Sequence, residues 1–351
     1  PMTLFASAPT SLCVLRLSAI GDCCNAVAAV QAIQREWPST AITWIMGTAE
    51  AALLEDLVGV EVVPFDKRAG FRGLRAVWRT LRGRRFDALL HMQNALRASA
   101  VSAAVQARLR LGFDADRAQD GQRFFTNRKV PSPQSRHVLD GFLAFAGELG
   151  VRDLTPHWSV PMPEEDEVWA SEALGSQKTL LLCPAASYAY KNWTVEGYAA
   201  IADHAADWGF RVALAASPAP QEMELAQRVK ARCEETPLDL AGKTTLKQLF
   251  ALVARADLVL APDTGPVHMA TAAGTPVVGL YAHHDPRRTG PYFCRDYAVS
   301  VYEECIRAEH GRAPDELPWR TRVRDPRAME HIEIDAVRAA FDRIVRDRGL
   351  A

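Results

Sequence analysis

Residues 261–268 combine side chains that could bind a negatively charged ligand. They follow the apolar run 258–260, which predicts a buried strand, and precede residues 268–274, which predict a short helix. Polar residues at such a turn lie at the carboxyl edge of an α/β sheet, where these folds bind ligands. Thr264 and Gly265 would offer a hydroxyl and free backbone N–H groups to a diphosphate, and Asp263 would face sugar hydroxyls. The structural alternative is an N-cap followed by a turn glycine.

A second turn of this kind lies early in the chain, at residues 17–22. Asp22 is expected at the start of a helix, where the carboxylate could serve as a general base or as a cap and dipole partner. A dinucleotide fingerprint would need G-x-G-x-x-G here, but only Gly21 is present, which disfavours a nicotinamide cofactor. A phosphate-binding P-loop is excluded, because no G-x-x-x-x-G-K-[ST] pattern occurs.

Two further loops follow strand-like runs in the second half. Residues 184–194 contain Lys191, whose ammonium could neutralise a phosphate or remain solvated on a loop. Glu222 follows residues 217–220 at the start of a helix, where a carboxylate could bind a ribose diol or interact with the helix dipole.

The first half contains a basic cluster between residues 67 and 85 of a chain with net charge −1. Five arginines recur at helical spacing and predict one strongly positive helix face: Arg68, Arg72, Arg75, Arg79 and Arg82. Like charges at this spacing repel each other, which is consistent with an anionic partner, and a phosphorylated glycolipid headgroup at a membrane fits this cluster as well as nucleic acid does. The alternative is a solvated surface.

Other polar residues follow a predicted strand of the first half and are expected at the ligand edge: His91, Gln93, Asn94 and Arg97. His283 and His284 stand beside Asp285 and resemble metal ligands, but adjacent side chains seldom share one ion and no third ligand has suitable spacing. We therefore expect no metal site and no cofactor.

The elements that must position these residues alternate between strand and helix in both halves, which favours parallel sheets with helices on both faces. In the first half, strands are predicted at 12–17, 42–46, 61–64 and 87–91, with helices at 26–37 and 71–81. In the second half, strands are predicted at 179–183, 210–215, 257–261 and 276–281, with helices at 194–208, 221–233, 246–254 and 335–348. The proline-rich segment 156–163 is the predicted linker. Two such domains would form a cleft between their carboxyl edges.

The composition agrees with a folded protein of two domains. The chain has 351 residues, 48% of them hydrophobic, and one core seldom grows past about 250–300 residues. No apolar run approaches the roughly 20 residues that span a bilayer, and the balanced charge gives no indication of nucleic-acid binding. Scattered cysteines without a C-x-x-C pair and the lack of a signal-peptide pattern predict a cytoplasmic protein.

Several motifs resemble, in order along nearly the whole chain, those of the bacterial heptosyltransferases of glycosyltransferase family 9. These are residues 18–22, 191–193, 240–244 and 263–268, and the start at residues 15–22 is most similar to heptosyltransferase I. The resemblance implies a GT-B fold, with an acceptor domain at 1–160, a donor domain at 161–325 and a terminal helix region at 326–351 that could pack back on the first domain. It also implies inverting, metal-independent transfer of L-glycero-D-manno-heptose from ADP-heptose to Kdo-lipid A at the cytoplasmic face of the inner membrane.

The resemblance also assigns roles to residues. Asp22 matches the family's proposed base. The positions on the diphosphate side are matched by Lys191, Thr264, Gly265 and His268. Asp263 matches a residue that contacts the heptose, and Glu222 and Thr244 lie near the adenosine positions. The acceptor side would use the basic cluster together with Gln93 and Arg97.

The chain departs from the family pattern at two places. Ala185 and Ala186 stand where members often have Thr or Ser, so Ser187 would substitute for them. Residues 23–25, Cys-Cys-Asn, replace the usual apolar residues after Asp22, which affects the acceptor side. Residues 287–292 with 317–319 resemble a branch that acts on phosphorylated Kdo.

Two alternatives to a heptosyltransferase remain open. A sugar-nucleotide 2-epimerase would use a related two-domain fold, and it would turn over its sugar nucleotide without an acceptor. A non-catalytic sugar-nucleotide or glycolipid binding protein would have lost part of the site, whereas Asp22, Lys191 and Asp263 are all present.

Overall fold

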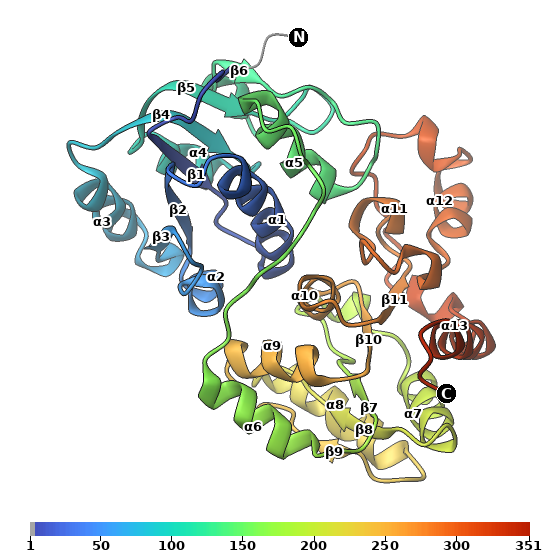
Figure 1. Cartoon of the computed structure of the whole chain (residues 1–351). Coiled ribbons are helices and arrows are strands. Elements are labelled where there is room, and N and C mark those ends of the chain that lie inside the picture. Colours follow the sequence, from blue (N-terminus) through green and yellow to red (C-terminus); the bar gives the residue numbers. More distant parts are fainter. Residues whose placement is uncertain (1–3) are drawn as a thin grey trace. The chain divides into compact units, whose positions relative to one another are not determined.

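The computed structural model describes residues 4–351 and divides into two compact units, residues 1–161 and 162–351. The first unit contains these strands and helices in chain order: β1 (Ser11–Leu15), α1 (Ile20–Glu36), β2 (Ala41–Gly47), α2 (Thr48–Leu54), β3 (Val60–Phe65), η1 (Lys67–Ala69), α3 (Phe71–Leu81), β4 (Arg85–His91), α4 (Leu96–Ser102), β5 (Gln106–Gly112), η2 (Gln122–Phe124), β6 (Arg128–Lys129) and α5 (Val138–Leu149). Figure 1 shows this unit in blue to green.

The six strands of the first unit form one parallel sheet in the order β3-β2-β1-β4-β5-β6. The central strand β1 is apolar on both faces, because Leu12 and Val14 point to one side while Cys13 and Leu15 point to the other, and all four are fully buried. Side chains of α3 and α4 pack with Cys13 and Leu15 on one face. On the other face, α1 packs against α5 (Figure 1).

The predicted linker has no helix or strand and is attached to α1 of the first unit. The Trp158 indole N–H donates a hydrogen bond to the Cys24 carbonyl oxygen at 2.7 Å. The Gln31 side-chain nitrogen donates to the Ser159 carbonyl oxygen, and the Gln31 side-chain oxygen accepts from the Ser159 N–H. These contacts hold residues 158 and 159 along α1, so the chain leaves the first unit just before α6 begins at Glu164.

The second unit contains α6 (Glu164–Leu174), β7 (Thr179–Leu182), η3 (Ala189–Lys191), α7 (Val195–Asp207), β8 (Arg211–Leu214), α8 (Pro220–Arg232), β9 (Leu238–Asp239), α9 (Leu246–Arg255), β10 (Leu258–Pro262), α10 (Gly265–Ala273), β11 (Val277–Tyr281), α11 (Pro286–Thr289), η4 (Arg295–Tyr297), β12 (Val299–Ser300), α12 (Tyr302–His310), η5 (Pro314–Glu316), η6 (Ala328–His331) and α13 (Ile334–Asp347). Its strands form a parallel sheet in the order β12-β11-β10-β7-β8-β9. Numbered within the unit, this is the same order as in the first sheet.

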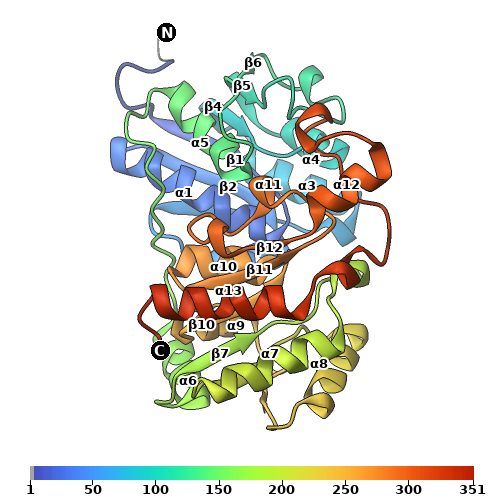
Figure 2. The ribbon, with the colours of Figure 1, turned by 90° about the vertical axis from the view of Figure 1, so that its right-hand side faces the viewer.

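Helices of the second unit fall into two groups. One group is formed by α9, which packs against α6 and α10, and the other by α7, which packs against α8 and α13. The terminal helix α13 (dark red in Figure 2) also contacts β11. Its Phe341 packs edge-to-face on Phe210. The structure thus places α13 in the second unit, and the packing of this helix on the first domain stays a prediction.

Local signals in the sequence explain where several helices begin and end. The Thr194 hydroxyl accepts a hydrogen bond from the Gly197 N–H at 3.0 Å and thereby caps the start of α7. The helix α10 ends at Gly274, whose φ of +75° is a conformation that glycine adopts at low cost. The largest difference from a predicted boundary is at α1, which begins at Ile20 and not at residue 26 and so contains Asp22 in its first turn.

Candidate functional site

The second sheet changes its winding direction between β7 and β10, which pair in parallel with Leu182 beside Leu260. Chain segments that leave two such strands diverge, and ligands of doubly wound folds bind in the space between them. Lys191 follows β7 and Asp263 follows β10, so the topology brings both predicted residues to the carboxyl edge at this point.

Asp263 is the centre of a buried polar network. Its Oδ2 accepts hydrogen bonds from the Lys191 Nζ at 3.0 Å and from the His284 Nδ1 at 2.7 Å. Lys191 also donates to the Asp263 carbonyl oxygen at 3.1 Å. All three side chains are largely buried, with exposed fractions of 17% or less.

The charges of this network follow from its geometry. Burial raises the pKa of Asp263, but the Lys191 ammonium and the hydrogen bond from His284 outweigh it and hold that pKa well below its usual range. Burial lowers the pKa of His284 more than the bond to Asp263 raises it, so His284 is neutral at pH 7. Because an ionised Asp263 only accepts hydrogen bonds, the His284 proton resides on Nδ1.

The first turn of α10 presents the predicted anion site. Thr264 occupies the N-cap position, yet its hydroxyl makes no capping bond. Within residues 4–351, the buried Thr264 Oγ1 has no hydrogen-bond partner, and a buried hydroxyl without one costs free energy. The structural alternative, a Thr cap, is therefore not what Thr264 provides. His268 lies buried in the same helix and contributes to the electrostatic stabilisation of the Asp263 anion.

The loop after β7 is fixed at both ends. The Asn192 side-chain oxygen accepts a hydrogen bond from the Ala186 N–H at 2.7 Å, and the Tyr190 carbonyl oxygen bonds the His283 Nε2 at 2.9 Å. This loop exposes Ser187 and positions Lys191. His283 and His284 thus anchor the loop and the carboxylate, and no group of three His, Cys, Asp or Glu side chains in the described part of the chain could hold a metal ion.

Glu222 and Thr244 follow the neighbouring strands β8 and β9 at the same edge of the sheet. The Glu222 Oε2 accepts a hydrogen bond from the Ser217 N–H at 3.1 Å, which shapes the turn before α8. Gly242 has a φ of +70°, and a Cβ there would meet the Met223 sulfur at 2.5 Å. The positive φ is a conformation that glycine adopts at low cost, and the Gly242 N–H donates to the Ala216 carbonyl oxygen at 2.9 Å, so the turn that leads to Thr244 passes beside the segment before α8.

The first sheet changes its winding direction between β1 and β4, where Leu15 pairs with His91. Asp22 lies in the first turn of α1 after β1 and forms an ion pair with Arg16. A second guanidinium nitrogen of Arg16 donates to the Met92 carbonyl oxygen at 2.8 Å, and the group lies over the Phe142 ring. Arg16 therefore holds the Asp22 carboxylate, which remains 30% exposed.

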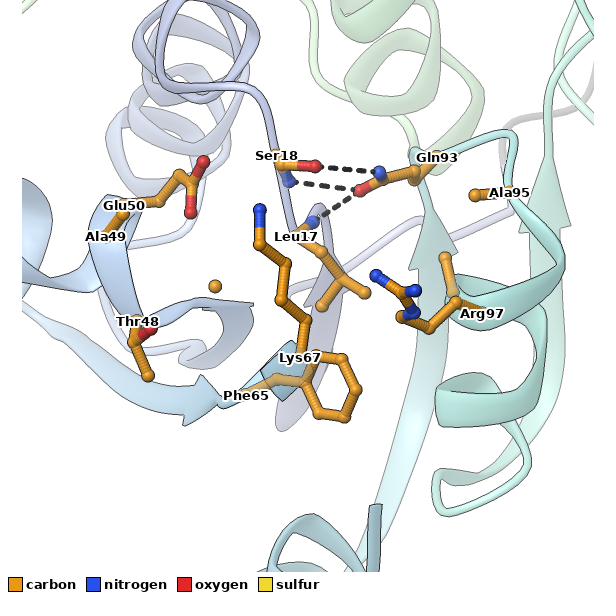
Figure 3. Close-up of a pocket in the computed structure, with 12 residues that line it drawn as sticks. Leu17, Ser18, Thr48, Ala49, Glu50, Phe65, Lys67, Gln93, Ala95 and Arg97 are labelled. Atoms are coloured by element: carbon orange, nitrogen blue, oxygen red, sulfur yellow. Dashed lines mark hydrogen bonds between the residues drawn. The ribbon is translucent and has the colours of Figure 1, made fainter. Parts of the chain in front are cut away.

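Gln93 stabilises the same turn from β4. Its side-chain oxygen accepts hydrogen bonds from the N–H groups of Leu17 and Ser18 at 2.5 and 3.2 Å, and its nitrogen donates to the Ser18 hydroxyl at 3.3 Å (Figure 3). The predicted binding residue Gln93 thus also has a structural role, because it fixes the backbone that leads into α1.

A pocket of about 350 Å³ opens at this edge of the first sheet, and Gln93 and Arg97 both line it. Figure 3 shows the Lys67 and Arg97 side chains extending into the pocket, with the Glu50 carboxylate on the α2 side. Burial raises the pKa of Glu50, although the nearby Lys67 opposes that change. Two cations and a wall that includes Phe65 suit an anionic ligand with an apolar face.

The structure divides the predicted acceptor residues into separate groups. Arg72, Arg75 and Arg79 lie on the exposed surface of α3, whereas Arg68 belongs to the separate turn η1 and Arg82 ends the helix as its C-cap. The prediction of one continuous helix face from 68 to 82 is therefore wrong at both ends. Gly70, with a φ of +53°, interrupts the backbone before Phe71, and Arg82, with a ψ of 127°, has left the helical conformation.

Three site residues were missed or misjudged in the sequence. His284 was considered only as a metal ligand, Lys67 only as part of a basic run, and Arg16 only as part of a motif. Each follows a strand end, β11, β3 or β1, and that position was the signal that could have identified them.

His91 does not face a ligand as expected but is fully buried at the end of β4. Its Nδ1 lies 3.3 Å from the Gln122 amide nitrogen, and its Nε2 lies 3.3 Å from the Ser99 hydroxyl. Since an amide nitrogen only donates, His91 Nδ1 accepts and the proton resides on Nε2. Burial lowers the pKa of His91 to about 4.

This burial predicts acid sensitivity. An unfolded His91 binds a proton near pH 6.5, whereas the folded protein binds it only near pH 4, so stability is complete above pH 6.5 and falls between these values. The loss should approach 3 kcal/mol, at about 1.36 kcal/mol per pKa unit. Urea unfolding at pH 4.5–7.5 should show a smaller pH slope for His91→Gln than for the wild type, and His310→Gln, at an exposed site, should keep the full slope. An unchanged slope in His91→Gln would contradict the assignment.

Comparisons with known proteins agree with this arrangement. Residues 74–316 match the family model of glycosyltransferase family 9 (heptosyltransferase). The chain is 45% identical over 337 residues to the lipopolysaccharide core heptosyltransferase OpsX of Haemophilus influenzae, covering 96% of this chain and 97% of that protein.

Solved structures share the fold. A family 9 glycosyl transferase from Veillonella parvula has a TM-score of 0.79 at 20% identity and covers 99% of both chains. The Escherichia coli heptosyltransferase WaaC with ADP has a TM-score of 0.69 at 20% identity, covering 97% of this chain and 100% of that one. These structures confirm the expected GT-B fold, and the family model together with the 45% identical heptosyltransferase confirms the expected transferase activity. The chain belongs to glycosyltransferase family 9, the heptosyltransferases.

Proposed function

We propose that this protein transfers L-glycero-D-manno-heptose from ADP-heptose to a Kdo residue of the lipopolysaccharide inner core, with inversion at the anomeric carbon. The single observation that carries the proposal is the Lys191–Asp263 pair beside the Thr264 turn at the β7/β10 edge. The similarity to a lipopolysaccharide core heptosyltransferase and to a heptosyltransferase structure that contains ADP supports this choice of acceptor and donor.

The donor diphosphate is assigned to the start of α10. Lys191 supplies a positive charge, Thr264 a hydroxyl, and the first N–H groups of the helix the positive end of its dipole. Both hydrogen bonds that Asp263 accepts from Lys191 and His284 fall on Oδ2, so Oδ1 can accept a bond from a heptose hydroxyl. Glu222 and Thr244 at the β8/β9 edge are assigned to the adenosine, Ser187 to the phosphates, and His268 to the charge balance of the site.

The acceptor is assigned to the first unit. Lys67 and Arg97 extend into the 350 Å³ pocket and would bind the Kdo carboxylate or a phosphate on that sugar. The pocket begins at Ser18, in the turn that leads into α1 and Asp22. Because the acceptor contains acyl chains, we place the reaction at the cytoplasmic face of the inner membrane. Within residues 4–351, no helix is long and apolar enough to cross that membrane.

The reaction follows from these assignments. An acceptor hydroxyl transfers its proton to the Asp22 carboxylate while its oxygen attacks the anomeric carbon of the heptose from the face opposite to ADP. The bond from that carbon to the phosphate oxygen breaks, and the ADP leaves with the electron pair. Lys191 and the helix N-terminus stabilise the charge on the leaving diphosphate, a contribution of roughly 3–4 kcal/mol for one well-placed donor. These groups can carry the charge without a metal ion.

A turnover assay with the purified protein tests the proposal. ADP-heptose with Kdo-lipid A, phosphorylated or not, should yield ADP and a product heavier by one heptose in mass spectrometry. ADP-heptose alone should remain unchanged over the same time, and added EDTA should leave the rate unaltered. Conversion of the sugar nucleotide without acceptor would identify an epimerase, and binding without any product would identify a non-catalytic protein.

The role of Asp22 as a base predicts a large loss on substitution. Asp22→Asn keeps the shape of the side chain but removes the basic carboxylate, so kcat should fall by about 10²–10⁴-fold while the Kd for ADP-heptose changes little. Asp335→Asn is the matched control, since Asp335 also lies in the first turn of a helix, α13. If kcat fell by less than tenfold in Asp22→Asn, Asp22 would be only a structural partner of Arg16 and not the base.

Substitution of His284 should also lower the activity, by a smaller factor, because His284 acts through Asp263. His284→Ala removes a hydrogen bond to a charged acceptor, which is worth about 1.5–3 kcal/mol, so kcat/KM for the donor should fall by roughly 10- to 100-fold. His284→Asn keeps an N–H donor near the position of Nδ1 and should recover most of the activity. The acceptor KM should not move in either variant. Equal activity of His284→Ala and the wild type would remove His284 from the site.

A further inference from the structure

The exposed face of α3 combines aromatic and cationic side chains in one narrow strip. At about 100° per residue, Phe71, Arg75 and Trp78 project within about 60° of one another, and Arg72 and Arg79 lie together on one side of them. Phe71 is 77% exposed and Trp78 is 54% exposed. The helix contains no acidic residue, and none of its arginines forms an ion pair within the described residues.

The orientation of this strip is fixed by the opposite face of α3. Val77 and Leu81 are buried in the core of the first sheet. Gly73 lies so close to η1 that a Cβ on it would meet the Asp66 carbonyl oxygen at 2.3 Å. The helix therefore cannot rotate to bury its aromatic rings, and the two rings and the cations stay at the surface together.

A groove lies beside the strip and extends its chemistry. It has a volume of about 450 Å³ and is lined by Arg75, Trp78, Arg79 and Arg82 on one side and by Ala103 and Ala104 on the other. Guanidinium groups bind phosphate oxygens through paired hydrogen bonds, and the small alanines and the indole ring offer apolar surface. This pairing of anion donors with apolar contacts matches the headgroup region of an anionic phospholipid.

We propose that α3 is a bilayer-docking surface, defined as Phe71, Arg72, Arg75, Trp78, Arg79 and Arg82. The two aromatic side chains enter the interface between headgroups and acyl chains, and the arginines bind lipid phosphates. The inner leaflet's anionic lipids complement this charge, whereas a zwitterionic bilayer does not. These arginines then contact the membrane around the acceptor and not the acceptor sugar, which binds at Lys67 and Arg97.

The location of the surface fits its purpose. Lys67, which extends into the acceptor pocket, precedes Phe71 by four residues, and Arg97 of that pocket lies in the first turn of the helix α4 that contacts α3. Docking α3 on the bilayer would bring this pocket to a lipid-anchored sugar. This link between docking and catalysis rests on the proposed function. The docking surface itself is inferred from the side chains of α3 alone.

Vesicle co-sedimentation tests the surface without any acceptor. The full-length protein should bind phosphatidylcholine vesicles that contain about 30% phosphatidylglycerol, and it should bind vesicles of pure phosphatidylcholine only weakly. Binding should weaken as salt rises from about 0.05 to 0.5 M, because screening shortens the reach of the charges. Equal binding to both kinds of vesicle, or no binding to either, would overturn the proposal.

Two double variants separate the contributions. Arg75→Gln with Arg79→Gln should weaken binding to anionic vesicles by roughly 10- to 30-fold, since each basic residue contributes about one kcal/mol. The matched control is Arg228→Gln with Arg232→Gln, two exposed arginines at the same spacing on α8. Phe71→Ser with Trp78→Ser should also weaken binding, and Phe293→Ser, at another exposed aromatic, should not. Wild-type binding in both α3 variants would overturn the proposal.

Activity on a deacylated, water-soluble Kdo acceptor distinguishes the bilayer from the sugar as the partner. All α3 variants should keep the wild-type KM for this acceptor while losing activity on acceptor embedded in vesicles. A raised KM for the soluble acceptor, or displacement from vesicles by single-stranded RNA at stoichiometric amounts, would overturn the assignment to a bilayer. Vesicle binding that persists in a protein without transferase activity would overturn the proposed function and leave the docking surface intact.

Discussion

A carboxylate removed from water needs a cation and hydrogen bonds, and this requirement shapes the site of the second unit. Asp263 satisfies it with Lys191 and His284 at 3.0 and 2.7 Å. Removing one partner of such a pair leaves an uncompensated buried charge, at a cost of about 3–5 kcal/mol. Lys191 is therefore held in place at the start of α10 before any ligand arrives, and the same ammonium is the natural counter-charge for a diphosphate there.

The fold makes this pair possible because both sheets have the same strand order. Each sheet changes its winding direction at its first strand, between β7 and β10 in one unit and between β1 and β4 in the other. Segments that leave the two strands diverge and expose side chains at one edge. The pair Lys191 and Asp263 therefore occupies the same topological position in its unit as the pair Asp22 and Gln93 does in the other. The segments of the second unit form an anion site, whereas those of the first unit form a carboxylate beside a cationic pocket.

Much of this arrangement could be predicted from the sequence, because it depends on local pattern. The run 258–260 followed by Asp263, Thr264 and Gly265 identified a strand, a turn and a helix start, and the spacing over 71–81 gave the exact bounds of α3. The position of His284 after β11 was a local signal, but its contact with Asp263 could not be predicted, since that contact depends on the non-local pairing of β10 with β11. The start of α1 was also missed, because helix propensity is weak at Cys23, Cys24 and Asn25 and tertiary packing of these buried residues decides.

The central claim, that Lys191 at the β7/β10 edge binds the donor's diphosphate, is tested most directly by calorimetric titration with ADP. The double variant Lys191→Met with Asp263→Asn removes both charges of the pair and so leaves no orphaned carboxylate. It should bind ADP at least about tenfold more weakly than the wild type, because a hydrogen bond to a charged group is lost. Lys230→Met, which breaks the Lys230–Asp239 pair of the same unit, should bind ADP like the wild type. Wild-type affinity in the double variant would contradict the account.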